Sequence, residues 1–165
     1  MLEVYASFEL TAFSIAVREV WWVFPTILVF HSLSMGLMAG VGIASALRRL
    51  GFARQIPPAL FSRFQPLLWL GMVVAATSGL LLLAGYPAKA LTNPLFFIKL
   101  AMLVIAFCMT LRMTSPVPRL LVEGRSTGRV PAALTIMLWL GIIASGRFLA
   151  YTHSVLLAYW LVGVP

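Results

Sequence analysis

Three residues able to bind ions or cofactors lie inside long hydrophobic stretches of this chain, namely His31, Lys99 and Arg147. A cation inside hydrocarbon is costly, and it is usually retained because an anion or a water-filled cavity needs it. Histidine imidazoles are common axial ligands of haem iron, and arginine binds carboxylates in a bidentate manner. These residue types therefore predict a site for an anionic ligand within the membrane.

Counting residues along the expected spans places these three side chains at a similar depth. Each lies roughly 13 to 17 residues from the basic end of its span, which is a difference of about 6 Å at about 1.5 Å per residue. His153 follows in the same span as Arg147 and would lie about 8 Å nearer the opposite surface than His31. We therefore expect His31, Lys99 and Arg147 to share one site in the outer half of the bundle.

The expected spans contain no aspartate or glutamate to pair with these cations, because the four acidic residues are Glu3, Glu9, Glu19 and Glu123. The counter-charge must then come from lipid headgroups, from a partner subunit or from a bound anionic cofactor. Haem b carries two propionates and accepts histidine ligands. The first hypothesis is a haem b electron-transfer subunit, with His31 and His153 as axial ligands and Lys99 and Arg147 at the propionates.

The same residues can also be explained without a cofactor-binding site. Lys99 lies five residues after Pro94 and can extend its charged end to the interface, as can Arg147. His31 and His153 can each form an ordinary hydrogen bond, within the bundle or at its surface. The alternative function is then an accessory or structural subunit of a larger membrane complex.

Copper handling is a further alternative. Met35 and Met38 follow His31 on the same helical face, and imidazole and thioether ligands suit Cu(I). Methionine is also a common packing residue in apolar helices. We find no nucleophilic triad and no metalloprotease motif, so catalysis by this chain alone is not expected.

The composition predicts an integral membrane protein. The chain has 165 residues, of which 62% are hydrophobic, and a mean hydropathy of +1.02. The lone Cys108 falls in an expected span and offers no disulfide framework. The net charge of +8 does not indicate nucleic acid, because eight of the twelve basic residues fall in segments 48–65 and 112–130 between spans.

We expect an all-α fold, an up-down-up-down four-helix transmembrane bundle at 20–165, preceded by an amphipathic surface helix at 1–19. The surface helix is expected from Ala6, Leu10, Phe13 and Val17, which recur at helical spacing with Glu3, Glu9 and Arg18 elsewhere. The spans are expected at 20–47, 66–85, 94–112 and 131–160. Gly36 and Gly40 form a G-x-x-x-G pair typical of close helix contact, and Gly71, Gly79, Gly141 and Gly146 would allow similar contacts.

The basic residues between spans also predict the orientation. Arginine-rich connections face the cytoplasm, so both termini are expected in the periplasm of a bacterial inner membrane. The expected partners are the lipid bilayer and other membrane-protein subunits.

Several stretches resemble an uncharacterised bacterial family of small four-helix inner-membrane proteins. The motifs are His31-Ser-Leu-Ser-Met35 with Leu47-Arg-Arg-Leu-Gly51, Thr77-Ser-Gly-Leu80, Asn93-Pro-Leu-Phe-Phe-Ile-Lys99 and Gly146-Arg-Phe-Leu-Ala-Tyr151. The resemblance implies a four-helix membrane fold, highlights His31, Lys99 and Arg147, and implies no settled activity. His153 lies outside the pattern. A more distant similarity is to membrane domains of the copper-resistance D type, which also carry histidines on helices.

Overall fold

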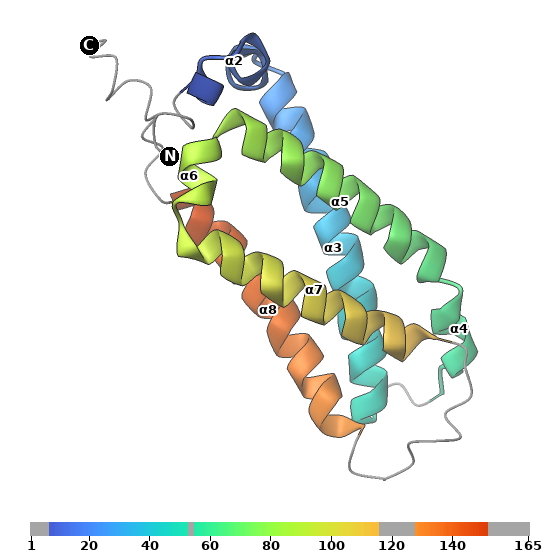
Figure 1. Cartoon of the computed structure of the whole chain (residues 1–165). Coiled ribbons are helices and arrows are strands. Elements are labelled where there is room, and N and C mark those ends of the chain that lie inside the picture. The colour runs from blue at the N-terminus through green and yellow to red at the C-terminus, as the bar shows by residue number, and fades with distance from the viewer. Residues whose placement is uncertain (1–6, 53–54, 116–127, 152–165) are drawn as a thin grey trace.

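Four long apolar helices form the body of the molecule (Figure 1). The computed structural model describes residues 7–52, 55–115 and 128–151. The long helices are α3 (Val23–Leu50), α5 (Gln65–Gly85), α7 (Pro94–Thr114) and α8 (Arg129–Tyr151). All four are long and apolar enough to cross a hydrocarbon core of about 30 Å. The all-α, four-helix fold expected from the sequence is confirmed, and the chain is a multi-pass membrane protein.

Proline, glycine and asparagine set the ends of these helices. α3 ends at Leu50 and is capped by Gly51, whose backbone is left-handed with φ 110°, a conformation that glycine adopts without strain. The side chain of Asn93 accepts a hydrogen bond of 2.9 Å from the Leu95 amide, and Pro94 occupies the first turn of α7. The expected boundaries agree within about three residues, apart from the last span, whose expected extension to residue 160 lies outside the described residues.

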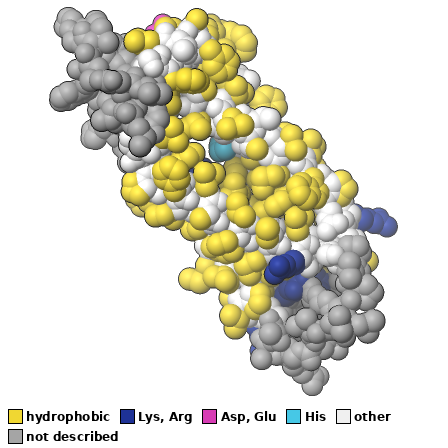
Figure 2. Space-filling model, in the orientation of Figure 1, with side chains coloured by type: hydrophobic (Ala, Val, Ile, Leu, Met, Phe, Trp, Pro, Cys, Tyr) yellow, Lys and Arg dark blue, Asp and Glu magenta, His cyan; other side chains and the backbone are white. Residues whose placement is uncertain are grey.

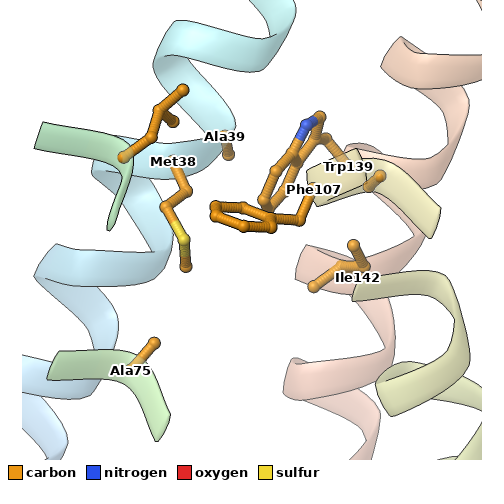
Figure 3. Close-up of a cluster of buried hydrophobic side chains, with 8 residues drawn as sticks. Met38, Ala39, Ala75, Phe107, Trp139 and Ile142 are labelled. Carbon is orange, nitrogen blue, oxygen red and sulfur yellow. The ribbon is translucent and has the colours of Figure 1, made fainter. Parts of the chain in front are cut away.

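α3 is the central helix of the bundle. It packs against α5, α7 and α8, while α7 also packs along α8. α5 and α7 share no extended interface in the described part of the chain. The buried core lies where the four helices meet (Figure 3), and it contains Met38, Ala39, Leu68, Ala75, Ala106, Phe107, Trp139 and Ile142. Because α3 touches all three other helices, its inward face sets the position of the rest.

One buried hydrogen bond ties α7 to α8 within this core. The indole Nε1 of Trp139 donates to the Oγ1 of Thr110 over 3.1 Å, and both side chains are fully buried. Gly42 of α3 lies directly against this pair, since a Cβ there would be 2.8 Å from Thr110 Oγ1 and closer still to Trp139. α3 can therefore approach Trp139 and Thr110 this closely only because Gly42 has no side chain.

The expected G-x-x-x-G contact does not occur inside the bundle. A Cβ added to Gly36 or Gly40 would meet nothing within 4 Å among the described residues. The glycines that do line helix contacts are Gly42, Gly71, Gly79, Gly85, Gly141 and Gly146. Gly71, Gly79, Gly141 and Gly146 were expected from the sequence, whereas Gly42 and Gly85 were not.

The short helix α2 (Ala12–Glu19) lies across the outer end of α5, and residues 1–6 are outside the described chain. Its buried face differs from the expected one. Within α2, Val17 is buried as expected but Phe13 is exposed; before α2 begins, Leu10 is exposed and Glu9, expected on the polar side, is only 1% exposed. Specific packing on the end of α5, rather than simple hydrophobic periodicity, decides which face is buried.

The two shortest helices complete the connections. α4 (Pro58–Ser62) precedes α5, and α6 (Pro87–Leu91) joins α5 to α7. Arginines gather at the end of the bundle where α3 and α7 finish and α8 begins, and Arg49 donates to the carbonyl of Arg112 across this end over 3.4 Å. We call it the basic end, and the described arginines there are Arg48, Arg49, Arg63, Arg112 and Arg129.

Candidate functional site

His31 lies at a junction of α3 and α5, eight residues after α3 begins. Its Nδ1 is 3.0 Å from the Oγ of Ser78 on α5. The ring lies against Gly79, whose added Cβ would be 3.4 Å from the imidazole Cε1. A serine and a glycine in neighbouring positions of α5 therefore hold the imidazole, one by a hydrogen bond and one by leaving room.

The surroundings of Ser78 favour one tautomer of His31. The serine hydroxyl has a single proton, and it donates this proton to the carbonyl of Val74 in its own helix, with the carbonyl of Ala75 at 3.3 Å. Its oxygen is then free to accept a hydrogen bond from Nδ1–H of the imidazole. In this arrangement Nε2 keeps its lone pair, the state that histidine needs in order to bind a metal.

Lys99 approaches the same level of the bundle from α7. Its Nζ lies 3.5 Å from the position that a Cβ on Gly146 of α8 would occupy. Its helix α7 packs against α3, the helix that carries His31. The structure thus places His31 against Ser78 and Gly79 of α5 and Lys99 against Gly146 of α8, and we take these surroundings together as one candidate site.

No acidic residue in the described part of the chain balances the Lys99 charge. All four acidic residues of the sequence lie outside the four spans, and Lys99 makes no salt bridge or side-chain hydrogen bond within the described parts of the chain. A half-buried ammonium in an apolar bundle is costly without an anion, a polar ligand or water. The site therefore has the charge and the free imidazole nitrogen to receive a ligand with an anionic group.

Figure 2 shows where this site reaches the surface. A histidine side chain is visible in a hollow of the largely hydrophobic face between α5 and α7, and His31 is the sole histidine among the described residues. Both His31 and Lys99 are half-buried rather than enclosed. The site is therefore open on the side that would face lipid.

Arg147 is exposed on α8, although it directly follows Gly146, the residue that lies against Lys99. Its charge thus reaches the surface of the bundle at about the level of the site. His153, the expected second axial ligand, lies outside the described residues.

The two methionines proposed as copper ligands differ in their surroundings. Met38 is fully buried in the core, and its Cγ would lie 3.0 Å from a Cβ on Gly71. Met35, one helical turn after His31, is half-buried at the edge of the same core. Among the described residues, no group of three His, Cys, Asp or Glu side chains could hold a metal ion.

Ser78 and Gly79 were not identified as site residues from the sequence. The same depth count would have found them, because Ser78 lies about as far along its span as Lys99 does along its own, at about 1.5 Å per residue. Serine and glycine are frequent in membrane helices, so their type alone carries little information.

No family model, curated protein or solved structure matches this chain. The family resemblance seen in its motifs therefore remains a prediction, and the function has to be argued from the site itself.

Proposed function

We propose that this chain is a membrane subunit that binds haem b at His31 and Lys99 and takes part in electron transfer. The carrying observation is the hydrogen bond of 3.0 Å between His31 Nδ1 and Ser78. It orients the ring, and with Nδ1–H as the donor Nε2 would be the ligand nitrogen, which is how metal-binding histidines are commonly held by a second partner.

The charge of the site supports an anionic cofactor. Haem carries two carboxylates on one edge of an apolar ring, and Lys99 supplies a cation with no acidic residue in any span to compete for it. A charge-assisted hydrogen bond from Lys99 to a propionate would satisfy both groups. When bound, haem supplies a one-electron redox couple, and the protein sets its potential through ligands, hydrogen bonds and burial.

The residues of this chain have separate roles in the proposal. His31 would provide one axial ligand through Nε2, and Ser78 would position the imidazole. Lys99 would fix the orientation of the ligand by holding its anionic edge. His153 is the other histidine of the chain and stays the candidate for the second axial position.

A reduced-minus-oxidised absorption spectrum of the purified protein, with haemin supplied, tests the proposal. We expect the α band of a b-type cytochrome. We expect His31→Ala to abolish it and Ser78→Ala to retain it with an altered midpoint potential. Arg147→Leu is the matched charge-removal control and should leave the band unchanged. The absence of an α band in the unmodified protein would overturn the proposal.

Two other functions give different results on the same sample. Copper handling through His31, Met35 and Met38 predicts stoichiometric copper by elemental analysis and no haem. It is supported by the half-buried Met35 next to His31, but Met38 is enclosed in the core. An accessory subunit without cofactor predicts neither metal nor haem, together with other membrane chains that co-purify in mild detergent.

The proposed setting is a bacterial inner membrane with both termini in the periplasm. The support is the gathering of arginines at one end of the bundle, because positively charged connections stay on the cytoplasmic side. The His31–Lys99 site then lies in the periplasmic half of the membrane.

A further inference from the structure

The four helices do not surround the His31–Lys99 site on all sides. α3 has packing partners on several sides, but α5 and α7 share no extended interface within the residues described. In the orientation of Figures 1 and 2, these two helices flank the hollow in which the histidine is visible. The missing helix contact and the half-exposed imidazole therefore lie on the same side of the molecule.

The opening between α5 and α7 is bounded at both of its ends. Toward the basic end, Trp69 of α5 and Phe107 of α7 meet edge to face, with ring centroids 5.3 Å apart. Toward the opposite end, the short helix α6 joins α5 to α7. Between these limits the opening faces the hydrocarbon of a membrane, because the two helices span it.

The two helices that flank the opening pack apolar side chains against the edge of the core, among them Met72 of α5 and Leu103 of α7, which are partly buried. Lys99 and His31 are likewise half-buried, and they add a cation and an imidazole to these apolar surroundings. A matching ligand is flat and apolar over most of its surface and carries an anionic group at one edge.

We propose that the opening between α5 and α7 is a lateral portal through which haem passes from the lipid bilayer to His31 and Lys99, propionate edge toward the lysine. This inference rests on the proposed function for the identity of the ligand. The existence of the opening is inferred from helix packing alone, so it can be tested without any ligand. The charge complementarity between Lys99 and a carboxylate decides in favour of haem over a neutral lipid.

Spin labels report directly whether the portal is open to lipid. In a Cys108→Ser background, nitroxide labels are placed at Met72→Cys and Leu103→Cys in phosphatidylcholine vesicles, and collisions with oxygen and with a water-soluble nickel chelate are measured. The native Cys108, which is exposed on α7, is the lipid-facing control. Ile142→Cys, at a position that is 1% exposed, is the buried control.

We expect the labels at 72 and 103 to collide with oxygen several-fold more often than the label at 142 and about as often as the label at 108, with few nickel collisions. Oxygen rates equal to those at 142 would show a closed helix contact and overturn the portal. Nickel rates above the oxygen rates would show access from water and overturn it equally.

Addition of haemin to the labelled proteins tests whether haem is the ligand that enters the portal. Oxygen collisions should fall at 72 and 103 but not at 108, and Lys99→Met should remove this protection while Lys99→Arg retains it. If haemin gives a His31-dependent spectrum without protecting 72 and 103, the portal is wrong and the proposed function stands. If haemin gives no spectrum at all, the proposed function and the occupant both fail, and the oxygen rates alone decide the portal.

Discussion

Lys99 and Arg147 carry the same charge at nearly the same level of the bundle, but their surroundings differ. Lys99 is half-buried, with its Nζ against Gly146 of the neighbouring helix, whereas the Arg147 side chain is exposed. An exposed arginine can extend toward the interface and keep its hydration, while a half-buried lysine depends more on what lies next to it. The two residues should therefore respond differently to loss of charge.

Replacing Lys99 with methionine should weaken haem binding. Loss of a charge-assisted hydrogen bond costs about 1.5–3 kcal/mol, which is a factor of roughly 10 to 150 in Kd. Lys99→Arg should recover most of the affinity because it keeps the charge. Haemin titration of the purified variants, followed by absorbance, measures the effect, and equal affinity for Lys99→Met and the unmodified protein would contradict the role given to the lysine.

Arg147→Leu should leave both haem binding and stability nearly unchanged. Substitutions at exposed positions usually stay within about 0.5 kcal/mol, and removing a charge that faces lipid is neutral or favourable. Thermal unfolding in lipid nanodiscs, followed by tryptophan fluorescence, measures this. A loss of several kcal/mol would instead indicate a buried anionic partner for Arg147.

At the scale of helices, close packing depends on single glycines at defined positions. Gly42→Ala would place a methyl group against Thr110 Oγ1 and Trp139, which are joined by the hydrogen bond between α7 and α8. Overpacking of a core costs about 1–3 kcal/mol. Gly40→Ala is the matched control, because nothing described lies within 4 Å of the added group. Thermal unfolding of the pair should show a loss for Gly42→Ala only, and equal midpoints would contradict the packing described.

The contact between α2 and α5 depends on Arg18. Its guanidinium donates to the carbonyl of Gly85 at the end of α5 over 3.1 Å, to Ser14 over 2.8 Å and to the carbonyl of Glu9 over 2.9 Å. A cation at a helix C-terminus also interacts favourably with the helix dipole. These contacts hold the outer end of the helix that carries Ser78.

Arg18→Gln should loosen that end of α5 without unfolding the bundle. A local loss of about 2 kcal/mol corresponds to a roughly thirty-fold faster hydrogen exchange of the Tyr86 amide, which bonds to the Leu82 carbonyl. Glu19→Gln, an exposed change one residue away, serves as the control. Exchange at Tyr86 that is the same in both variants would show that Arg18 does not stabilise this junction.

At the scale of the whole molecule, the sequence predicts the spans well because apolar runs, prolines and glycines mark their ends. Counting along the spans also predicts that His31 and Lys99 lie at a similar depth. The rotation of each helix is not predictable in this way, because helices that are apolar on all sides show no preferred buried face. This is why the outward position of Gly36 and Gly40, the exposure of Arg147 and the contact at Gly42 emerge only from the packed structure.

The gathering of arginines at the basic end makes a prediction for the orientation of the whole bundle. Positively charged connections remain in the cytoplasm, so the connection between α3 and α5 should lie inside and the one between α6 and α7 outside. In a Cys108→Ser background, Gln55→Cys and Thr92→Cys place single exposed thiols in these two connections. A membrane-impermeant maleimide added to intact cells whose outer membrane has been made permeable should label position 92 at once and position 55 only after lysis. The opposite pattern would invert the bundle and place the His31–Lys99 site in the cytoplasmic half of the membrane.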